Sequence, residues 1–303
     1  MDSRQKKLTR RGLLKAAGTI AVTAAAVRLK AAPTEPSFAG EPAESKLPPL
    51  KLGLVTYNLA KDWDIDSIIK NAGEAKFEAV ELRTTHAHGV EVSLSPDQRK
   101  EVRARFQNSP VALASLGSTF EFHSADPTEL RKNIEGAKEY AGLAADVGAK
   151  GIKVRPNGLP NGVPEEETLK RIGSSLAEVG SKASEHGIEV RLEVHGQGTS
   201  RLPNVRKILD YAAHPNVFVC WNSNQTDLED GGLEANFQLV KDKIHFVHMR
   251  DLFLEEYPFR KLLRLLRDSG YKGYCCAEIP ESNDPLRVMK YYRGLFLAYQ
   301  DLL

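Results

Sequence analysis

Four polar side chains that suit a divalent metal ion stand at the ends of four consecutive apolar runs. They are Glu193, Asn222, His248 and Glu278. Two carboxylates, an amide oxygen and an imidazole form a mixed oxygen and nitrogen donor set, which suits Mn²⁺, Mg²⁺, Co²⁺ or Zn²⁺. A buried histidine taken alone is more often a hydrogen-bonded core residue than a ligand. The joint placement of the four residues is therefore what predicts a metal site.

The run IHFVHMRDL, residues 244–252, shows the pattern behind this prediction. Alternate side chains of a strand point to opposite faces, so His248 and Arg250 share one face while Val247 and Met249 occupy the other. A polar pair that closes an apolar run is typical of a strand whose C-terminal end opens into a site.

Eight such apolar runs, each followed by a helical pattern, organise the chain from residue 50 onward, and this alternation predicts a (β/α)8 TIM barrel. The alternative is a doubly wound open sheet, which usually carries a glycine-rich phosphate turn after its first strand. Residues 56–60, where that turn would lie, contain no glycine. The expected strands are 51–57, 77–82, 111–116, 151–154, 188–194, 217–221, 245–249 and 274–279. The expected helices are 65–75, 96–108, 127–147, 165–186, 205–212, 233–240, 259–269 and 285–299.

Several other apolar runs also carry polar residues near their C-terminal ends, on one face of the expected strand. Burying so many charges is costly unless they pair with one another, with a metal or with a polar ligand. A salt-bridge network on the barrel floor is the alternative, although floor side chains are usually bulky and branched. These inward-facing residues are Glu81, Arg83, Lys153, Arg155, Arg191, Glu193, His195, Asn222 and Asn224.

Three motifs carry a resemblance to a known family: RLEVHG at 191–196, HMRD at 248–251 and GYKGYCCAEI at 270–279. At these residues the chain resembles the xylose isomerase-like barrels, specifically the sugar phosphate isomerase/epimerase type. The resemblance covers the chain from about residue 50 to its end. It implies that Glu193, His248 and Glu278 supply three ligands to one divalent ion. The fourth falls on Asn222, where the family pattern expects aspartate, so the donor set has one negative charge fewer.

The resemblance also implies the reaction. Glu193 and Glu278 are expected to act as base and acid: one removes the proton alpha to a carbonyl, giving an enediolate, and the other returns a proton to yield an epimer or an isomer. The expected partner is a small carbohydrate or keto-sugar. Two alternatives stay open, namely a keto-sugar lyase or dehydratase on the same site, and a non-catalytic sugar-binding barrel in which Asn222 marks a relic site.

A rim rich in hydrogen-bond donors suits a polyhydroxylated or anionic substrate. The histidine pair in the loop after the second strand could cap the substrate or bind a second metal, but two solvent-exposed loop histidines are an equally good interpretation. The predicted substrate-binding residues are Arg83, His86, His88, Lys153, Arg155, His195 and Arg250.

Composition argues against nucleic acid as a partner. The 303 residues are 41% hydrophobic and 27% charged, with a formal net charge of +2 and no polybasic stripe. Endonuclease IV-like enzymes share the expected fold but need a histidine-rich trinuclear zinc site, and this chain has only eight histidines. Three cysteines form neither a disulfide framework nor a zinc motif, and the adjacent Cys275 and Cys276 are expected to be core residues on opposite faces of a strand.

The N-terminal segment has the features of an export signal. Residues 9–15, TRRGLLK, resemble the twin-arginine motif and precede an Ala-rich apolar run. We therefore expect a twin-arginine signal peptide at 1–32, a flexible linker with five prolines at 33–49 and the barrel at 50–303. The apolar run is too short for a permanent membrane span, so the mature protein is expected in the periplasm. Assembly into a homo-oligomer is left open.

Overall fold

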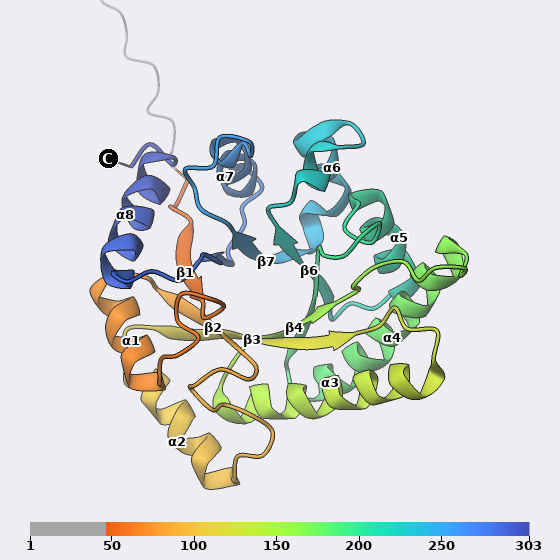
Figure 1. Cartoon of the computed structure of the whole chain (residues 1–303), viewed down its shortest axis with the longest axis horizontal. Helices are drawn as coiled ribbons and strands as arrows, with labels where there is room; N and C mark the ends of the chain where they lie inside the picture. The colour runs from red at the N-terminus through yellow and green to blue at the C-terminus, as the bar shows by residue number, and fades with distance from the viewer. Residues whose placement is uncertain (1–46, 303) are drawn as a thin grey trace, which may run out of the picture. The chain divides into compact units, whose positions relative to one another are not determined.

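A computed structural model describes residues 47–302, which form a closed barrel of eight parallel strands in the order β1 to β8 (Figure 1). The barrel closes where β1 pairs with β8. This confirms the predicted (β/α)8 TIM barrel. The predicted signal peptide and all but the last three residues of the predicted linker lie outside the described residues.

Each strand places its C-terminal end at the same end of the barrel, because all neighbouring strands are parallel. Polar residues late in the strands therefore gather at one mouth. The strands are β1 Lys51–Val55, β2 Ala79–Arg83, β3 Ala112–Glu121, β4 Gly151–Arg155, β5 Glu189–Glu193, β6 Val217–Asn222, β7 Ile244–Met249 and β8 Tyr274–Ala277.

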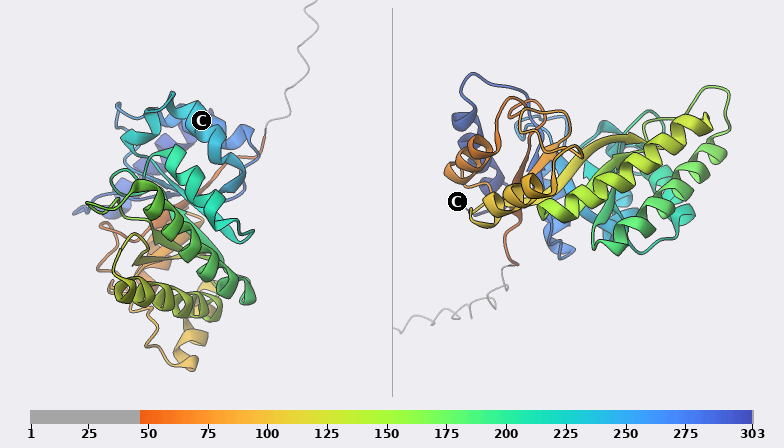
Figure 2. Two further views of the ribbon diagram at one scale, coloured as in Figure 1. Left: turned by 90° about the vertical axis from the view of Figure 1, so that its right-hand side faces the viewer. Right: turned by 90° about the horizontal axis from the view of Figure 1, so that it is seen from below.

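Helices surround the barrel, and the long helices α3 and α4 lie side by side on its outside (Figures 1 and 2). Between residues 47 and 302, no helix is both long and apolar enough to span a membrane. The helices are α1 Ile65–Glu74, α2 Pro96–Gln107, α3 Pro127–Val147, α4 Glu165–Glu185, α5 Leu202–Ala212, α6 Gly232–Val240, α7 Phe259–Asp268 and α8 Pro285–Ala298, with 3-10 turns η1 Gln225–Leu228 and η2 Lys241–Lys243.

The strand alternation divides the buried apolar residues into two cores. Leu54, Val80 and Val247 belong to the large core between strands and helices. The barrel interior holds a smaller cluster of mostly small side chains, which leaves room for polar groups above it. That inner cluster is Val55, Ala79, Ala114, Cys220, Phe246 and Cys276. As predicted, Cys275 and Cys276 lie in different cores, and all three cysteines are free and buried.

The third strand is longer than predicted, because it continues beyond Leu116 to Glu121. Gly117 and Ser118 interrupt the apolar pattern, which is why the sequence indicated an earlier end. The extension pairs Glu121 with Arg155 of β4, and their side chains also form an ion pair. A Cβ at Gly117 would lie 2.7 Å from Oε1 of Glu81, so the glycine leaves room for that carboxylate inside the barrel.

Candidate active site and metal centre

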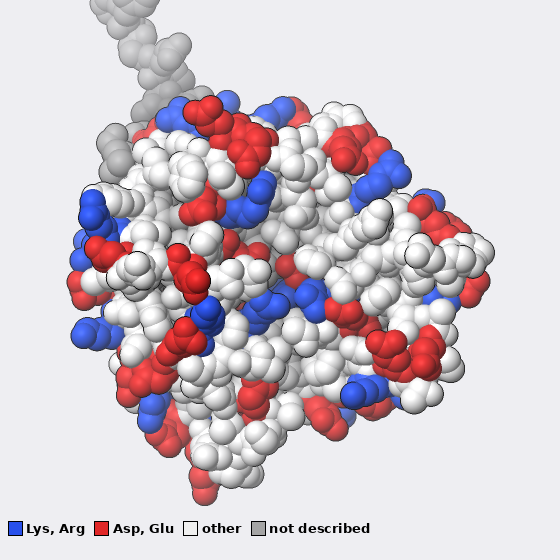
Figure 3. Space-filling view, in the orientation of Figure 1, with Lys and Arg blue, Asp and Glu red and all other residues white. Residues whose placement is uncertain are grey.

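The carboxyl ends of the strands surround a cavity of about 460 Å³ at the mouth of the barrel. In the space-filling view, basic and acidic side chains gather around a hollow at the centre of the barrel (Figure 3). This is the end at which TIM-barrel proteins place their active sites. The cavity is lined by Tyr57, Asn58, Arg83, Lys153, Arg155, Glu193, His195, Asn222, Asn224, Arg250, Asp251, Leu254, Glu278 and Pro280.

Glu193, His248 and Glu278 converge in this region, as the sequence predicted. One ligand atom from each lies within 4.8 Å of the others. Nδ1 of His248 is 3.6 Å from Oε1 of Glu193 and 3.8 Å from Oε2 of Glu278. Glu278 follows β8 directly, and its backbone N–H donates to the carbonyl of Met249 at 2.8 Å, which anchors it beside β7.

Glu81 of β2 is a member of the site to which the sequence assigned no role. Its Oε1 lies 3.1 Å from Nε2 of His248, and both side chains are fully buried. An ionised carboxylate can only accept, so Nε2 of His248 donates to Glu81. Burial would lower the pKa of His248, but the negative charges of Glu81 and Glu278 raise it well above its ordinary value. When the imidazole is neutral, as a metal ligand must be, the lone pair of Nδ1 faces Glu193 and Glu278. Burial alone would raise the pKa of Glu81, but His248 and Lys153 outweigh it and the pKa lies below its ordinary value. The inward position of Glu81 on its strand was the available signal.

Lys153 of β4 and Asn222 of β6 both contact Glu193. Nζ of Lys153 lies 2.8 Å from Oε2 of Glu193, with both side chains almost completely buried. Nδ2 of Asn222 donates to Oε1 of the same carboxylate at 3.2 Å. All four residues predicted as metal ligands are thus near one another, but Asn222 is a hydrogen-bond donor to Glu193 in this arrangement.

The two candidate catalytic carboxyl groups have pKa values shifted in opposite directions. Burial would raise the pKa of Glu193, but Lys153 and His248 hold it well below its ordinary value. The pKa of Glu278 is raised, chiefly by burial and also by the negative charge of Glu193, although His248 opposes this. Two carboxyl groups whose environments separate their pKa values are suited to divide the roles of base and acid.

The cluster fits a divalent cation. Nδ1 of His248 is buried and, in the part of the chain that the structure describes, has no hydrogen-bond partner. It faces the oxygens of Glu193 and Glu278, which are hard ligands, while Glu81 orients the imidazole from behind. Glu193, His248 and Glu278 would hold the ion.

Donor groups on the cavity wall are held in place by their neighbours. Arg83 lies over the ring of Tyr57, with 4.8 Å between the guanidinium carbon and the ring centroid. Arg250 donates from Nε to the carbonyl of Ser223 at 2.8 Å. Together with His195, these groups present positive charge and hydrogen-bond donors to the cavity, as expected for a polyhydroxylated ligand.

The two loop histidines are not among the residues that line this cavity. Nδ1 of His86 lies 3.0 Å from Oγ1 of Thr56. His88 is buried, with one ring nitrogen 2.8 Å from the carbonyl of Arg83 and the other accepting from the N–H of Val90 at 3.0 Å. Backbone groups therefore occupy both His88 nitrogens, and the role of this residue is to shape the loop. We assign neither histidine a contact with the ligand or with a second metal.

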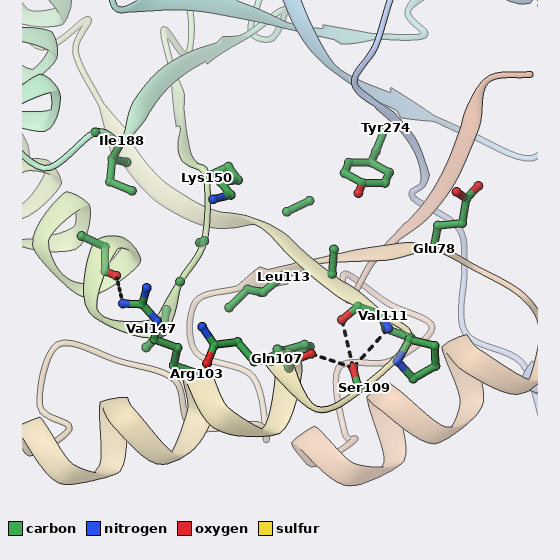
Figure 4. Close-up of a pocket in the computed structure, with 18 of the residues that line it drawn as sticks. Glu78, Arg103, Gln107, Ser109, Val111, Leu113, Val147, Lys150, Ile188 and Tyr274 are labelled. Atoms are coloured by element: carbon green, nitrogen blue, oxygen red, sulfur yellow. Dashed lines mark hydrogen bonds between the residues drawn. The ribbon is translucent and has the colours of Figure 1, made fainter. Parts of the chain in front are cut away.

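A second cavity of about 720 Å³ lies at the opposite end of the barrel (Figure 4). Its wall includes the start of three strands at Lys51, Leu113 and Tyr274, and the exposed side chains of Arg103 and Lys150. This end of a TIM barrel serves stability rather than catalysis. The cavity also lacks the convergent carboxylates found at the mouth, so we place the active site at the mouth.

A closed eight-strand barrel with two glutamates and a histidine at its mouth defines a TIM-barrel protein with a candidate metal centre. Residues 69–294 match the xylose isomerase-like TIM barrel family, and the chain belongs to this family. It is also similar to an L-ribulose 3-epimerase of Methylomonas sp. (strain DH-1). The two are 21% identical over 219 residues, which cover 68% of this chain and 74% of the relative.

Solved structures share the fold. A 3-keto-D-glucoside 4-epimerase from E. coli in its apo form matches with a TM-score of 0.69 and 16% sequence identity. The match covers 82% of this chain and 99% of the epimerase chain. The IolI protein with a bound zinc atom has a TM-score of 0.69 and 17% identity, with the same coverage of 82% and 99%. At these identities the similarity establishes the architecture.

Proposed function

We propose that this protein is a sugar isomerase or epimerase that moves a proton alpha to the carbonyl of a keto-sugar. The observation that carries the proposal is the buried cluster of Glu193, His248 and Glu278 beside the cavity at the barrel mouth. The similarity to an L-ribulose 3-epimerase supports the same reaction class.

The chemistry follows from the residues around the cavity. At neutral pH Glu193 is ionised and is the proton acceptor, whereas Glu278, with its raised pKa, is the group better able to hold and return a proton. Arg83, Arg250 and His195 would bind the hydroxyl groups and orient the sugar between the two carboxyl groups. A divalent ion on Glu193, His248 and Glu278 would polarise the carbonyl when bound.

Proton return to the opposite face of the same carbon gives an epimer, and return to the neighbouring carbon gives an isomer. To test the proposal, the purified protein is incubated with a panel of keto-sugars and Mn²⁺, and the products are identified by NMR. Conversion to an epimer or isomer is the expected result. A dehydrated product would instead favour the lyase, and sugar binding without any conversion would favour a non-catalytic sugar-binding barrel.

We also propose that the protein is exported to the periplasm. The basis is the order of residues near the N-terminus, where the Arg10–Arg11 pair precedes an Ala-rich apolar run. A homo-oligomeric state stays a prediction.

A further inference from the structure

Lys153 places a positive charge of the chain itself on a proposed metal ligand. Its Nζ lies 2.8 Å from Oε2 of Glu193, and the two side chains are 5% and 4% exposed. The same Nζ donates to the carbonyl of Ser118 at 3.2 Å, and Oγ of Ser118 donates to the carbonyl of Lys153 at 2.6 Å. Two strands thus hold the ammonium group against the carboxylate.

Asn222 engages the other oxygen of the same carboxylate. Its Nδ2 donates to Oε1 of Glu193 at 3.2 Å. An aspartate at this position has no hydrogen to donate and would instead repel Glu193. Oε1 of Glu193 therefore accepts a hydrogen bond from Asn222, and Oε2 forms an ion pair with Lys153. Within residues 47–302, neither Oε2 of Glu193 nor Nδ1 of His248 has a hydrogen-bond partner.

We propose that Lys153 competes with the divalent ion for Glu193, and that Lys153 and Asn222 together give this centre a weak affinity for metal. The competition has two parts. Asn222 donates to Oε1 of Glu193, the oxygen that faces Nδ1 of His248, and Lys153 at Oε2 neutralises the carboxylate and repels a second cation held a few ångströms away in a buried site. The inference rests on the metal site of the proposed function and adds the residue that lowers the affinity of that site for a divalent ion.

Removing the charge of Lys153 tests the inference directly. Mn²⁺ is titrated by calorimetry into wild-type protein and into the Lys153→Met variant, both treated with chelator and dialysed. The variant is expected to bind Mn²⁺ at least about tenfold more tightly, because a cation next to the site has been removed. Lys51→Met is the matched control, since Lys51 is exposed at the opposite end of the barrel, and it should bind as the wild type does.

The variant Lys153→Met leaves a buried carboxylate with fewer partners, so folding must be checked by thermal unfolding. Lys153→Gln serves as the second variant, because its amide can still donate to Glu193 without carrying charge. Tighter Mn²⁺ binding in a folded variant supports the inference even if the wild type shows no binding. Binding that is equal to or weaker than that of the wild type in the folded Lys153→Gln protein overturns it.

The inference and the proposed function fail in different ways. If the wild type epimerises a keto-sugar but the Lys153 variants bind Mn²⁺ no more tightly, the inference alone is wrong. If the variants bind Mn²⁺ more tightly and the wild type converts no sugar, the inference stands and the proposed function is wrong.

Discussion

The carboxylate of Glu81 lies 3.1 Å from Nε2 of His248, and neither side chain is exposed. The two residues are 167 positions apart in the chain and come from β2 and β7. A carboxylate behind a metal-binding histidine fixes the imidazole and its tautomer, and such partners matter for metal affinity. This contact explains why Nδ1 of His248, and not Nε2, faces Glu193 and Glu278.

The variant Glu81→Gln should therefore weaken metal binding without changing any direct ligand. The glutamine amide can donate to Nε2 of His248, which places the imidazole hydrogen on Nδ1 and blocks the proposed ligand atom. We expect a loss of about 10–100-fold in Mn²⁺ affinity, measured by calorimetry. Glu78→Gln, an exposed position at the other end of the barrel, is the control. Unchanged affinity in folded Glu81→Gln would contradict the role of Glu81.

Gly117 should be intolerant of even one added methyl group. A Cβ at this position would lie 2.7 Å from Oε1 of Glu81, which is buried and held by His248. Gly117→Ala is expected to lower the free energy of unfolding by about 1–3 kcal/mol, as overpacking does, and to weaken Mn²⁺ binding by displacing Glu81. Gly142→Ala in α3 is the control, because nothing lies within 4 Å of its added Cβ. Urea unfolding of both variants checks the prediction. A free energy of unfolding for Gly117→Ala equal to that of Gly142→Ala would refute it.

Asp227 should make the stability of the fold depend on pH. Burial raises its pKa to about 8, although hydrogen bonds from the Tyr257 hydroxyl and the Asn224 N–H oppose the shift. An unfolded aspartate titrates near pH ~4, so the folded state holds one more proton between roughly pH 4 and pH 8. Its stabilising contribution is complete below that window, falls as the pH rises through the window, and is fully lost once the pH passes about 8.

The variant Asp227→Asn cannot titrate at this position and should flatten the pH dependence. Between about pH 5.5 and pH 7.5 the wild type should lose roughly 3 kcal/mol more of its free energy of unfolding than the variant, from about 1.4 kcal/mol per pH unit. Urea unfolding at both pH values provides the comparison. Parallel losses in the two proteins would mean that Asp227 does not carry the extra proton.

Export is tested at the arginine pair. Changing both Arg10 and Arg11 to lysine should leave full-length precursor inside the cell, because twin-arginine export depends on that pair. Immunoblots of periplasmic and cytoplasmic fractions distinguish precursor from mature protein. Arg28→Lys, outside the pair, should be exported normally. Normal export of the double variant would indicate another route.

The barrel and the faces of its strands could be predicted from sequence because both depend on local periodicity. The alternation of side chains along a strand indicates which of them face the barrel interior. Polar residues late in the strands indicate that the site lies at the C-terminal end of the barrel. This pattern was sufficient to predict that Glu193, Asn222, His248 and Glu278 lie near one another at the mouth of the barrel.

Contacts across the barrel could not be predicted, because they depend on distances between side chains of remote strands. The pairing of Glu81 on β2 with His248 on β7 belongs to this class. The ion pair of Lys153 with Glu193 joins the neighbouring strands β4 and β5, but it depends on their register, which periodicity does not indicate. The positions of His86 and His88 depend on the path of a loop, which has no periodicity to indicate it. The extension of β3 was missed because Gly117 and Ser118 resemble an end of strand.

The central claim is that Glu193 and Glu278 move a proton on a keto-sugar, and hydrogen exchange tests it most directly. Wild-type protein with Mn²⁺ is incubated with the keto-sugar panel in D₂O, and NMR follows deuterium incorporation next to the carbonyl. We expect exchange in the wild type and in Glu281→Gln, whose exposed side chain pairs with Lys61 outside the cavity. Glu193→Gln and Glu278→Gln should each slow it by at least about 100-fold. Exchange that persists at the wild-type rate in both glutamine variants, or no exchange by the wild type with any sugar of the panel, would contradict the account.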